Sequence, residues 1–107
     1  MSIEEISPEE LKRRQASGVP PRLIDVREPW DVAMAAIPGA IHIPLNELPQ
    51  RLGELDPKAD TVVMCKAGGR SLRAAMFLQT RGFSHVANLT GGIDAWTRDV
   101  DPSLPSY

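Results

Sequence analysis

The stretch TVVMCKAGGRSLRAAMFLQTRG, residues 61–82, contains the pattern on which the fold depends. Its first part, Val62 to Cys65, is continuously apolar, which indicates a strand covered on both faces, as in a parallel sheet. Residues 71–81 carry apolar side chains at helical spacing, and Gly82 is a typical helix end. The apolar face of this helix comprises Leu72, Ala74, Ala75, Met76, Phe77 and Leu78. A buried strand joined to a helix by a glycine-rich loop predicts an α/β protein with a largely parallel sheet.

The rest of the chain alternates between strand and helix patterns in the same way. At its start, Ser7 and Glu10 have the spacing of a capping box. Near its end, Thr90 is expected to cap a final helix. Further strands are predicted at residues 22–26, 40–43 and 85–89, and helices at 8–16, 29–35, 45–52 (broken by Pro49) and after Thr90, before an irregular tail. No internal repeat or linker interrupts this alternation, so we expect one domain over residues 1–107.

Composition narrows the class of protein. The chain has 107 residues, 42% of them hydrophobic and 24% charged, with a net charge of −2 and both signs interspersed. Neither a nucleic-acid footprint nor a membrane-spanning run is apparent, so we expect no nucleic-acid or membrane partner. The acidic start lacks the features of a secretory signal, and a single cysteine forms no internal disulfide. These features favour a cytoplasmic protein.

Cys65 stands at the end of the buried strand, where parallel α/β proteins place their ligands. Gly68 and Gly69 are free to adopt positive φ angles and turn backbone N–H groups inward, while Lys66 and Arg70 add positive charge. Such surroundings favour a thiolate and hence a nucleophilic cysteine. The competing interpretation is an inert buried thiol, which is the common fate of a lone cysteine. Two glycines and two cations at a strand-loop-helix junction favour function.

Loop length separates two kinds of cysteine chemistry. Four residues stand between Cys65 and Arg70. Cysteine-dependent phosphatases resemble this arrangement but have five, which makes room for a phosphate. The shorter loop indicates a tighter cup, better matched to a single sulfur atom carried on Cys65. A phosphatase therefore ranks last among the functions considered.

Four segments in order resemble the rhodanese, or thiosulfate sulfurtransferase, family. They are LIDVRE at 23–28, IPGAIHIPLNEL at 37–48, VVMCKAGGRS at 62–71 and LQTRGFSHVANLTGGIDAW at 78–96. The resemblance implies a rhodanese-like α/β fold, with a central, mostly parallel five-stranded sheet flanked by helices on both faces. It also implies a six-residue active loop from Cys65 to Arg70.

The family reaction assigns a role to each loop residue. The resemblance implies that Cys65 attacks the outer sulfur of thiosulfate or of a persulfide donor, forms a persulfide, and passes the sulfur to cyanide or a thiol. Lys66 and Arg70 would hold the anionic donor. The backbone amides of Ala67, Gly68, Gly69, Arg70 and Ser71 would stabilise the persulfide. No metal or organic cofactor is required, and His42 and His85 lack the spacing of zinc ligands.

Several residues outside the loop are expected to support it. In the family, Asp25, Arg27 and Glu28 mostly hold the active loop through hydrogen bonds and ion pairs; for Glu28 a surface ion pair is equally consistent. Trp30 and Trp96 are interpreted as packing anchors, with a tryptophan at the rim of the site as the alternative. Ser71 is expected to cap the helix after the loop, with its side chain facing the persulfide as a further possibility. Where the family often has Gly-His, Ala35 and Ala36 stand here.

Two other functions remain open at this point. One is a sulfur-relay module that exchanges persulfide with a sulfur-carrying protein, with thiosulfate only a laboratory substrate. The other is a non-catalytic, rhodanese-like binding domain, which the presence of Cys65 disfavours.

Overall fold

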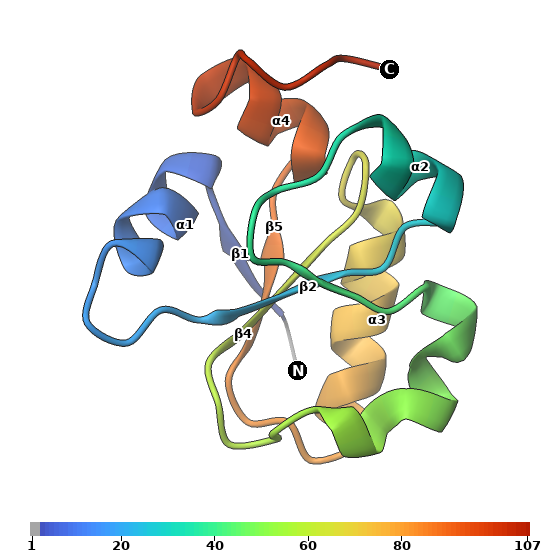
Figure 1. Cartoon of the computed structure of the whole chain (residues 1–107). Coiled ribbons are helices and arrows are strands. Elements are labelled where there is room, and N and C mark those ends of the chain that lie inside the picture. The colour runs from blue at the N-terminus through green and yellow to red at the C-terminus, as the bar shows by residue number, and fades with distance from the viewer. Residues whose placement is uncertain (1–2) are drawn as a thin grey trace.

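The computed structural model describes residues 3–107, and its five strands form one parallel sheet with the order β1-β5-β4-β2-β3 (Figure 1). The strands are β1 (Glu4–Ile6), β2 (Arg22–Asp25), β3 (Ile41–His42), β4 (Thr61–Met64) and β5 (Val86–Leu89). The helices are α1 (Pro8–Gln15), α2 (Pro29–Met34), α3 (Gly69–Thr80) and α4 (Gly92–Asp99), with a 3₁₀ helix, η1 (Leu45–Glu54). The predicted five-stranded sheet is confirmed, and every strand pair in it is parallel.

The strand order places the active loop at a switch in the connections. From β2 the chain continues to β3 on one side, and from β4 it continues to β5 on the other. The loops after β2 and β4 therefore diverge between two neighbouring strands, and ligands of open α/β sheets bind at such a point. The backbone N–H of Val26 donates to the carbonyl of Met64 (3.0 Å), which ties the two loops together at their start.

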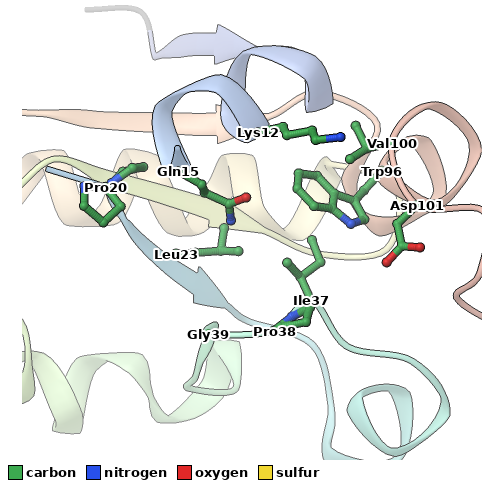
Figure 2. Close-up of a pocket in the computed structure, with 11 residues that line it drawn as sticks. Lys12, Gln15, Pro20, Leu23, Ile37, Pro38, Gly39, Trp96, Val100 and Asp101 are labelled. Atoms are coloured by element: carbon green, nitrogen blue, oxygen red, sulfur yellow. The ribbon is translucent and has the colours of Figure 1, made fainter. Parts of the chain in front are cut away.

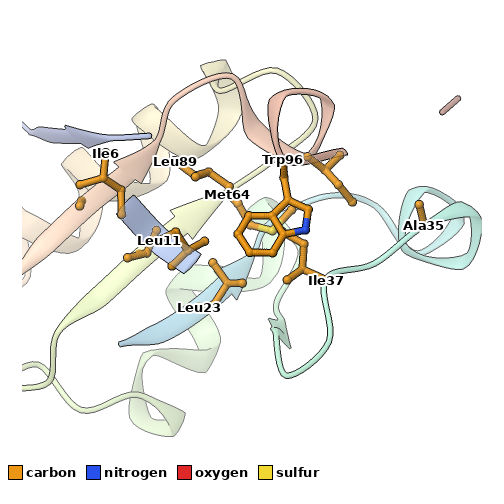
Figure 3. Close-up of a cluster of buried hydrophobic side chains, with 11 residues drawn as sticks. Ile6, Leu11, Leu23, Ala35, Ile37, Met64, Leu89 and Trp96 are labelled. Carbon is orange, nitrogen blue, oxygen red and sulfur yellow. The ribbon is translucent and has the colours of Figure 1, made fainter. Parts of the chain in front are cut away.

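Successive side chains along the central strands point to opposite faces of the sheet and therefore belong to two separate hydrophobic cores. Leu23 of β2 and Met64 of β4 face a core covered by α1 and α4, in which Trp96 lies against Leu23, Met64 and Ile37 (Figure 3). The opposite face is covered by α3 and η1. Its core comprises Ile24, Val26, Ile43, Leu48, Val63, Cys65, Ala74, Ala75, Leu78 and Phe83. Cys65 is thus packed on the α3 side of the sheet.

The N-terminal region differs from the prediction in two ways. The strand β1 was missed, because it has three residues and only Ile6 is buried. At α1, Ser7 Oγ accepts from the Glu10 N–H (3.1 Å) as predicted. The Glu10 carboxylate, however, binds Arg14 (2.8 Å) and Arg13, so the described contacts complete only half of the capping box.

Some helical features also depart from the sequence-based expectation. The η1 helix continues through Pro49. In a 3₁₀ helix each turn is closed by one backbone hydrogen bond, so the missing N–H of proline removes only one such bond. Trp30 is 68% exposed, so its predicted packing role is wrong; α2 buries none of its residues.

Met76 is 50% exposed, because the buried face of α3 is narrower than predicted. Thr90 does not cap α4, which begins after Gly91, and its hydroxyl donates to Glu5 (2.8 Å).

Among residues 3–107, none of the helices combines the length and apolarity needed to cross a membrane.

Candidate active site

The loop after β4 is shorter than the sequence suggested, because α3 already begins at Gly69. Arg70 therefore lies in the first turn of α3. Gly68 precedes the helix with φ 112°, a conformation that favours glycine. Both glycines are able to adopt a positive φ, and only Gly68 of the two does so. The left-handed residue turns the backbone so that the start of α3 points back at Cys65.

Hydrogen-bond donors of the loop and of the first turn of α3 surround the Cys65 sulfur. The Gly68 N–H donates to Sγ at 3.0 Å, and Ser71 Oγ lies 3.3 Å from it. Burial by itself raises the pKa of the Cys65 thiol. Hydrogen bonds from the Ser71 hydroxyl and from the amides of Ser71, Gly68 and Ala67 outweigh burial and lower that pKa below its ordinary value. The thiolate is thus favoured mainly by hydrogen bonds, whereas the sequence pointed to the loop cations as well.

A buried polar network extends behind the sulfur. Ser71 is fully buried and does not cap α3; the cap position belongs to Gly68. Its Oγ lies 2.6 Å from Asn88 Oδ1. The Asn88 amide nitrogen donates to the Glu5 carboxylate (3.1 and 3.2 Å) and to the Gly68 carbonyl (3.2 Å). Asn88 was not among the predicted site residues, although a polar residue within an otherwise apolar strand was an available signal.

Each loop cation has a carboxylate partner. Lys66 Nζ lies 3.0 Å from Asp94 Oδ1, and Arg70 Nη1 lies 3.6 Å from Asp31 Oδ2. Both cationic side chains are about one-third exposed, at 34% and 33%. An anion at the mouth of the loop would therefore compete with these carboxylates. The predicted role of both cations in binding a donor stays a prediction.

The first turn of α4 holds the start of the loop. The N–H groups of Ile93 and Asp94 donate to the carbonyls of Cys65 (2.9 Å) and Lys66 (3.1 Å). This approach requires glycine at position 92, which has φ 59° and where a Cβ would overlap both carbonyl oxygens. Gly92 is a further supporting residue, and the glycine pair before the last helix was its signal in the sequence.

The predicted supporting residues lie at the end of β2 and in the segment that follows it. Asp25 and Arg27 are buried and form an ion pair at 2.7 Å, in which Arg27 Nη2 also donates to the Ala35 carbonyl (2.8 Å). Neither has a described hydrogen bond to Cys65. Glu28 is only half-buried, and its backbone N–H donates to Asp31 Oδ2 (3.2 Å), the carboxylate that faces Arg70. The structure thus connects the loop after β2 to the active loop through Asp31.

A separate cavity of about 520 Å³ lies against α1 and α4 (Figure 2). Leu23, Ile37 and Trp96 form part of its wall, and the predicted site residues do not line it. Leu23 and Trp96 belong to the core on the other face of the sheet from Cys65. Within residues 3–107, no group of three or more His, Cys, Asp and Glu side chains is arranged to hold a metal ion.

Known proteins resemble this chain in sequence over most of its length. The family model of the rhodanese-like domain matches residues 7–99. The chloroplastic rhodanese-like/PpiC domain-containing protein 12 of Arabidopsis thaliana is 42% identical over 98% of this chain, which spans 38% of that protein. A sulfurtransferase of Allochromatium vinosum is 38% identical over 90% of each chain. The putative sulfur carrier protein YrkF of Bacillus subtilis is 38% identical over 90% of this chain, which spans 52% of that protein.

Solved structures resemble it in fold as well. The protein SSP1007 from Staphylococcus saprophyticus has a TM-score of 0.84 and 34% identity, covering 97% of this chain and 100% of that one. A rhodanese-like domain protein from Staphylococcus aureus has a TM-score of 0.86 and 28% identity, covering 98% and 99%. With the family match over residues 7–99, the chain belongs to the rhodanese-like family of sulfurtransferases and sulfur carriers.

Proposed function

We propose that this protein transfers a sulfane sulfur from thiosulfate, or from a small persulfide, to a thiophilic acceptor through a persulfide on Cys65. One observation carries the proposal. The only cysteine of the chain directly follows the central strand β4, and its sulfur accepts a hydrogen bond from the Gly68 N–H at 3.0 Å, with the Ser71 hydroxyl 3.3 Å away. Donors aimed at this atom favour the thiolate, which is the nucleophilic form.

The transfer divides into two displacements. In the first, the Cys65 thiolate attacks the outer sulfur of thiosulfate, a sulfur-sulfur bond forms to the protein, and the bond to the sulfonate sulfur breaks, releasing sulfite with its electron pair. In the second, cyanide or an acceptor thiolate attacks the outer sulfur of the persulfide. Thiocyanate or a new persulfide leaves, and the Cys65 thiolate is regenerated. Neither step requires an external oxidant or reductant.

The loop supports the persulfide stage in the same way as the thiolate stage. The added sulfur would carry the negative charge, and the amides from Ala67 to Ser71, in the loop and the first turn of α3, would stabilise it. Cys65 is 1% exposed. A slender donor that presents a terminal sulfur atom suits this narrow approach better than a bulky ester, which supports sulfur transfer over phosphate hydrolysis.

Intact-mass measurement after incubation with thiosulfate and desalting tests the proposal. We expect the mass to increase by one sulfur atom, cyanide to remove that atom as thiocyanate, and Cys65→Ser to gain nothing. Thr80→Ala, on the exposed far end of α3, is the matched control and should gain the same mass. A protein with a free Cys65 thiol that gains no sulfur from either thiosulfate or glutathione persulfide would contradict the proposal.

A relay of sulfur between proteins is the second candidate. Its support is the exposure of Trp30 (68%) and Met34 (55%) on α2, the helix whose Asp31 faces Arg70 of the site. An apolar surface beside the active loop suits a partner protein that carries the persulfide. Much faster sulfur loading from a persulfidated protein than from thiosulfate would favour the relay.

A reducing compartment such as the cytoplasm is the proposed setting, since a reduced lone thiol is needed in either case.

A further inference from the structure

The last residues of the chain return to the active loop. Beyond α4 the segment crosses toward α2 (Figure 1), and Leu104 packs against the core on the α4 side. At its end, the Tyr107 ring centroid lies 4.8 Å from Lys66 Nζ. The Tyr107 hydroxyl oxygen accepts a hydrogen bond from Arg27 Nη1. One side chain thus contacts both a loop cation and the buried arginine beneath the loop.

We propose that Tyr107 is a positioning residue, which holds the Lys66 ammonium at the mouth of the loop for an anionic donor. The inference rests on the proposed function only in taking Lys66 as a donor-binding cation. A lysine side chain is long and flexible, and a single exposed ion pair holds it weakly. Here the ammonium has two attachments, the Asp94 carboxylate at 3.0 Å and the face of the Tyr107 ring.

The two contacts of Lys66 differ in whether they leave its N–H groups available to bind a donor. Asp94 occupies N–H groups of Lys66, with both carboxylate oxygens about equally close at 3.0 and 3.1 Å. An incoming anion must take over some of these bonds. The ring attracts the ammonium through its quadrupole and needs no N–H group in return. Tyr107 therefore keeps Lys66 in place while the donor replaces Asp94.

Arg27 makes the ring a fixed platform. Its guanidinium is buried and held by Asp25 (2.7 Å), by the Ala35 carbonyl (2.8 Å) and by the Asp31 carbonyl (3.3 Å). A hydroxyl anchored on so constrained a group fixes one end of the tyrosine. The face of the ring is then directed at Lys66 rather than free to turn into solvent.

Two alkylating probes of the same chemistry test this without relying on sulfur transfer. Iodoacetate is an anion and iodoacetamide is neutral, and both alkylate thiolates, so we expect both to modify Cys65. We expect Tyr107→Leu to lower the ratio of their rates about two- to fivefold, the range implied by a cation–π contact at an exposed site. The iodoacetamide rate should stay unchanged. Ser106→Ala, at the exposed neighbouring position, should preserve the ratio.

Coupling to Lys66 makes the test specific. In a Lys66→Met background, Tyr107→Leu should have no further effect on the ratio, because the cation that it positions is absent. An unchanged ratio in the single variant, or an equal fall in the Lys66→Met background, overturns the inference. Should Tyr107→Leu fail to fold, the wild-type protein still decides: the ring should shift the Lys66 Cε proton resonances upfield, and ordinary values for these protons would refute the contact.

Failure of this inference and failure of the proposed function have different signatures. If the alkylation ratio responds as expected but no sulfur loads onto Cys65, the positioning of Lys66 holds and sulfur transfer does not. If sulfur loads normally and the ratio ignores Tyr107, the proposed function holds and the positioning role is wrong.

Discussion

Removal of the Ser71 hydroxyl is the perturbation that bears most directly on the Cys65 thiolate. Ser71 Oγ lies 3.3 Å from Sγ, and the hydroxyl is fully buried within α3. Ser71→Ala deletes one oxygen and leaves a good helix former, so backbone disturbance is minimal. The hydroxyl lowers the pKa of Cys65, so its loss should raise that pKa.

The size of the expected pKa change depends on how the single Ser71 hydroxyl proton is shared among its acceptors. Hydrogen bonds to charged groups contribute about 1.5–3 kcal/mol. Ser71 has one hydroxyl hydrogen, and Asn88 Oδ1 at 2.6 Å, together with the Gly68 carbonyl at 3.2 Å, competes for it with Sγ at 3.3 Å. The lower end, about 1.5 kcal/mol, is therefore appropriate, and it corresponds to about a tenfold smaller thiolate population at neutral pH.

The pH dependence of iodoacetamide alkylation at Cys65 measures this population. The rate rises with the thiolate fraction, so the midpoint should lie below the ordinary thiol pKa in the wild type and move upward in Ser71→Ala. Thr80→Ala removes an exposed hydroxyl from the other end of the same helix and should leave the midpoint in place. Thermal unfolding of each variant checks that the comparison is between folded proteins.

Two results would refute the reasoning. An unchanged midpoint would mean that Asn88 holds the Ser71 proton at all times and that the backbone amides alone favour the thiolate. A lowered midpoint would mean that the hydroxyl oxygen accepts from the thiol and stabilises the neutral form. In either case the Ser71 contact would not be the source of the lowered pKa of Cys65.

Two further substitutions test how the loop is supported. Gly92→Ala should cost about 2–4 kcal/mol of unfolding free energy, because a side chain at φ 59° is strained and its Cβ overlaps the Cys65 carbonyl. Urea denaturation measures it, with Gly69→Ala, which has open space and no positive φ, as a tolerated control. Arg27→Met leaves the buried Asp25 carboxylate without its partner and should cost about 3–5 kcal/mol in the same assay. The double variant Asp25→Leu with Arg27→Met should recover much of this loss, and a double variant as unstable as the single one would contradict the ion-pair explanation.

Much of the fold follows from local pattern. The apolar run before Cys65 predicted β4, and helical spacing after it predicted most of α3, because both elements bury a continuous set of side chains. The strand β1 could not be found in this way, since its three residues bury only Ile6 and its identity depends on pairing with β5. The burial of a residue such as Met76 depends on the helices around it, which the periodicity of α3 alone does not specify.

The candidate site divides along the same line. Residues from Cys65 to Ser71 are consecutive, so the sequence alone brings them together. Asn88, Asp94 and Tyr107 reach them only because the parallel sheet places the ends of β4 and β5 side by side and because the chain turns back after α4. No fixed spacing encodes such contacts. The sequence therefore predicted a nucleophile and its loop, but not the groups that the structure places around them.

These distant groups change how the loop cations act. The sequence indicated that Lys66 and Arg70 add positive charge at the loop, but Asp94 and Asp31 pair with them. The two pairs leave little net charge to attract an anion from a distance. If the two cations bind an anionic donor, as proposed above, its oxygens would have to replace a carboxylate at contact while its outer sulfur reaches Sγ. Such a site would select its donor by shape and hydrogen bonding as well as by charge. Hydrogen bonds from Ser71 and from the loop amides likewise lower the pKa of Cys65, so the same groups that favour the thiolate would define the space that a donor enters.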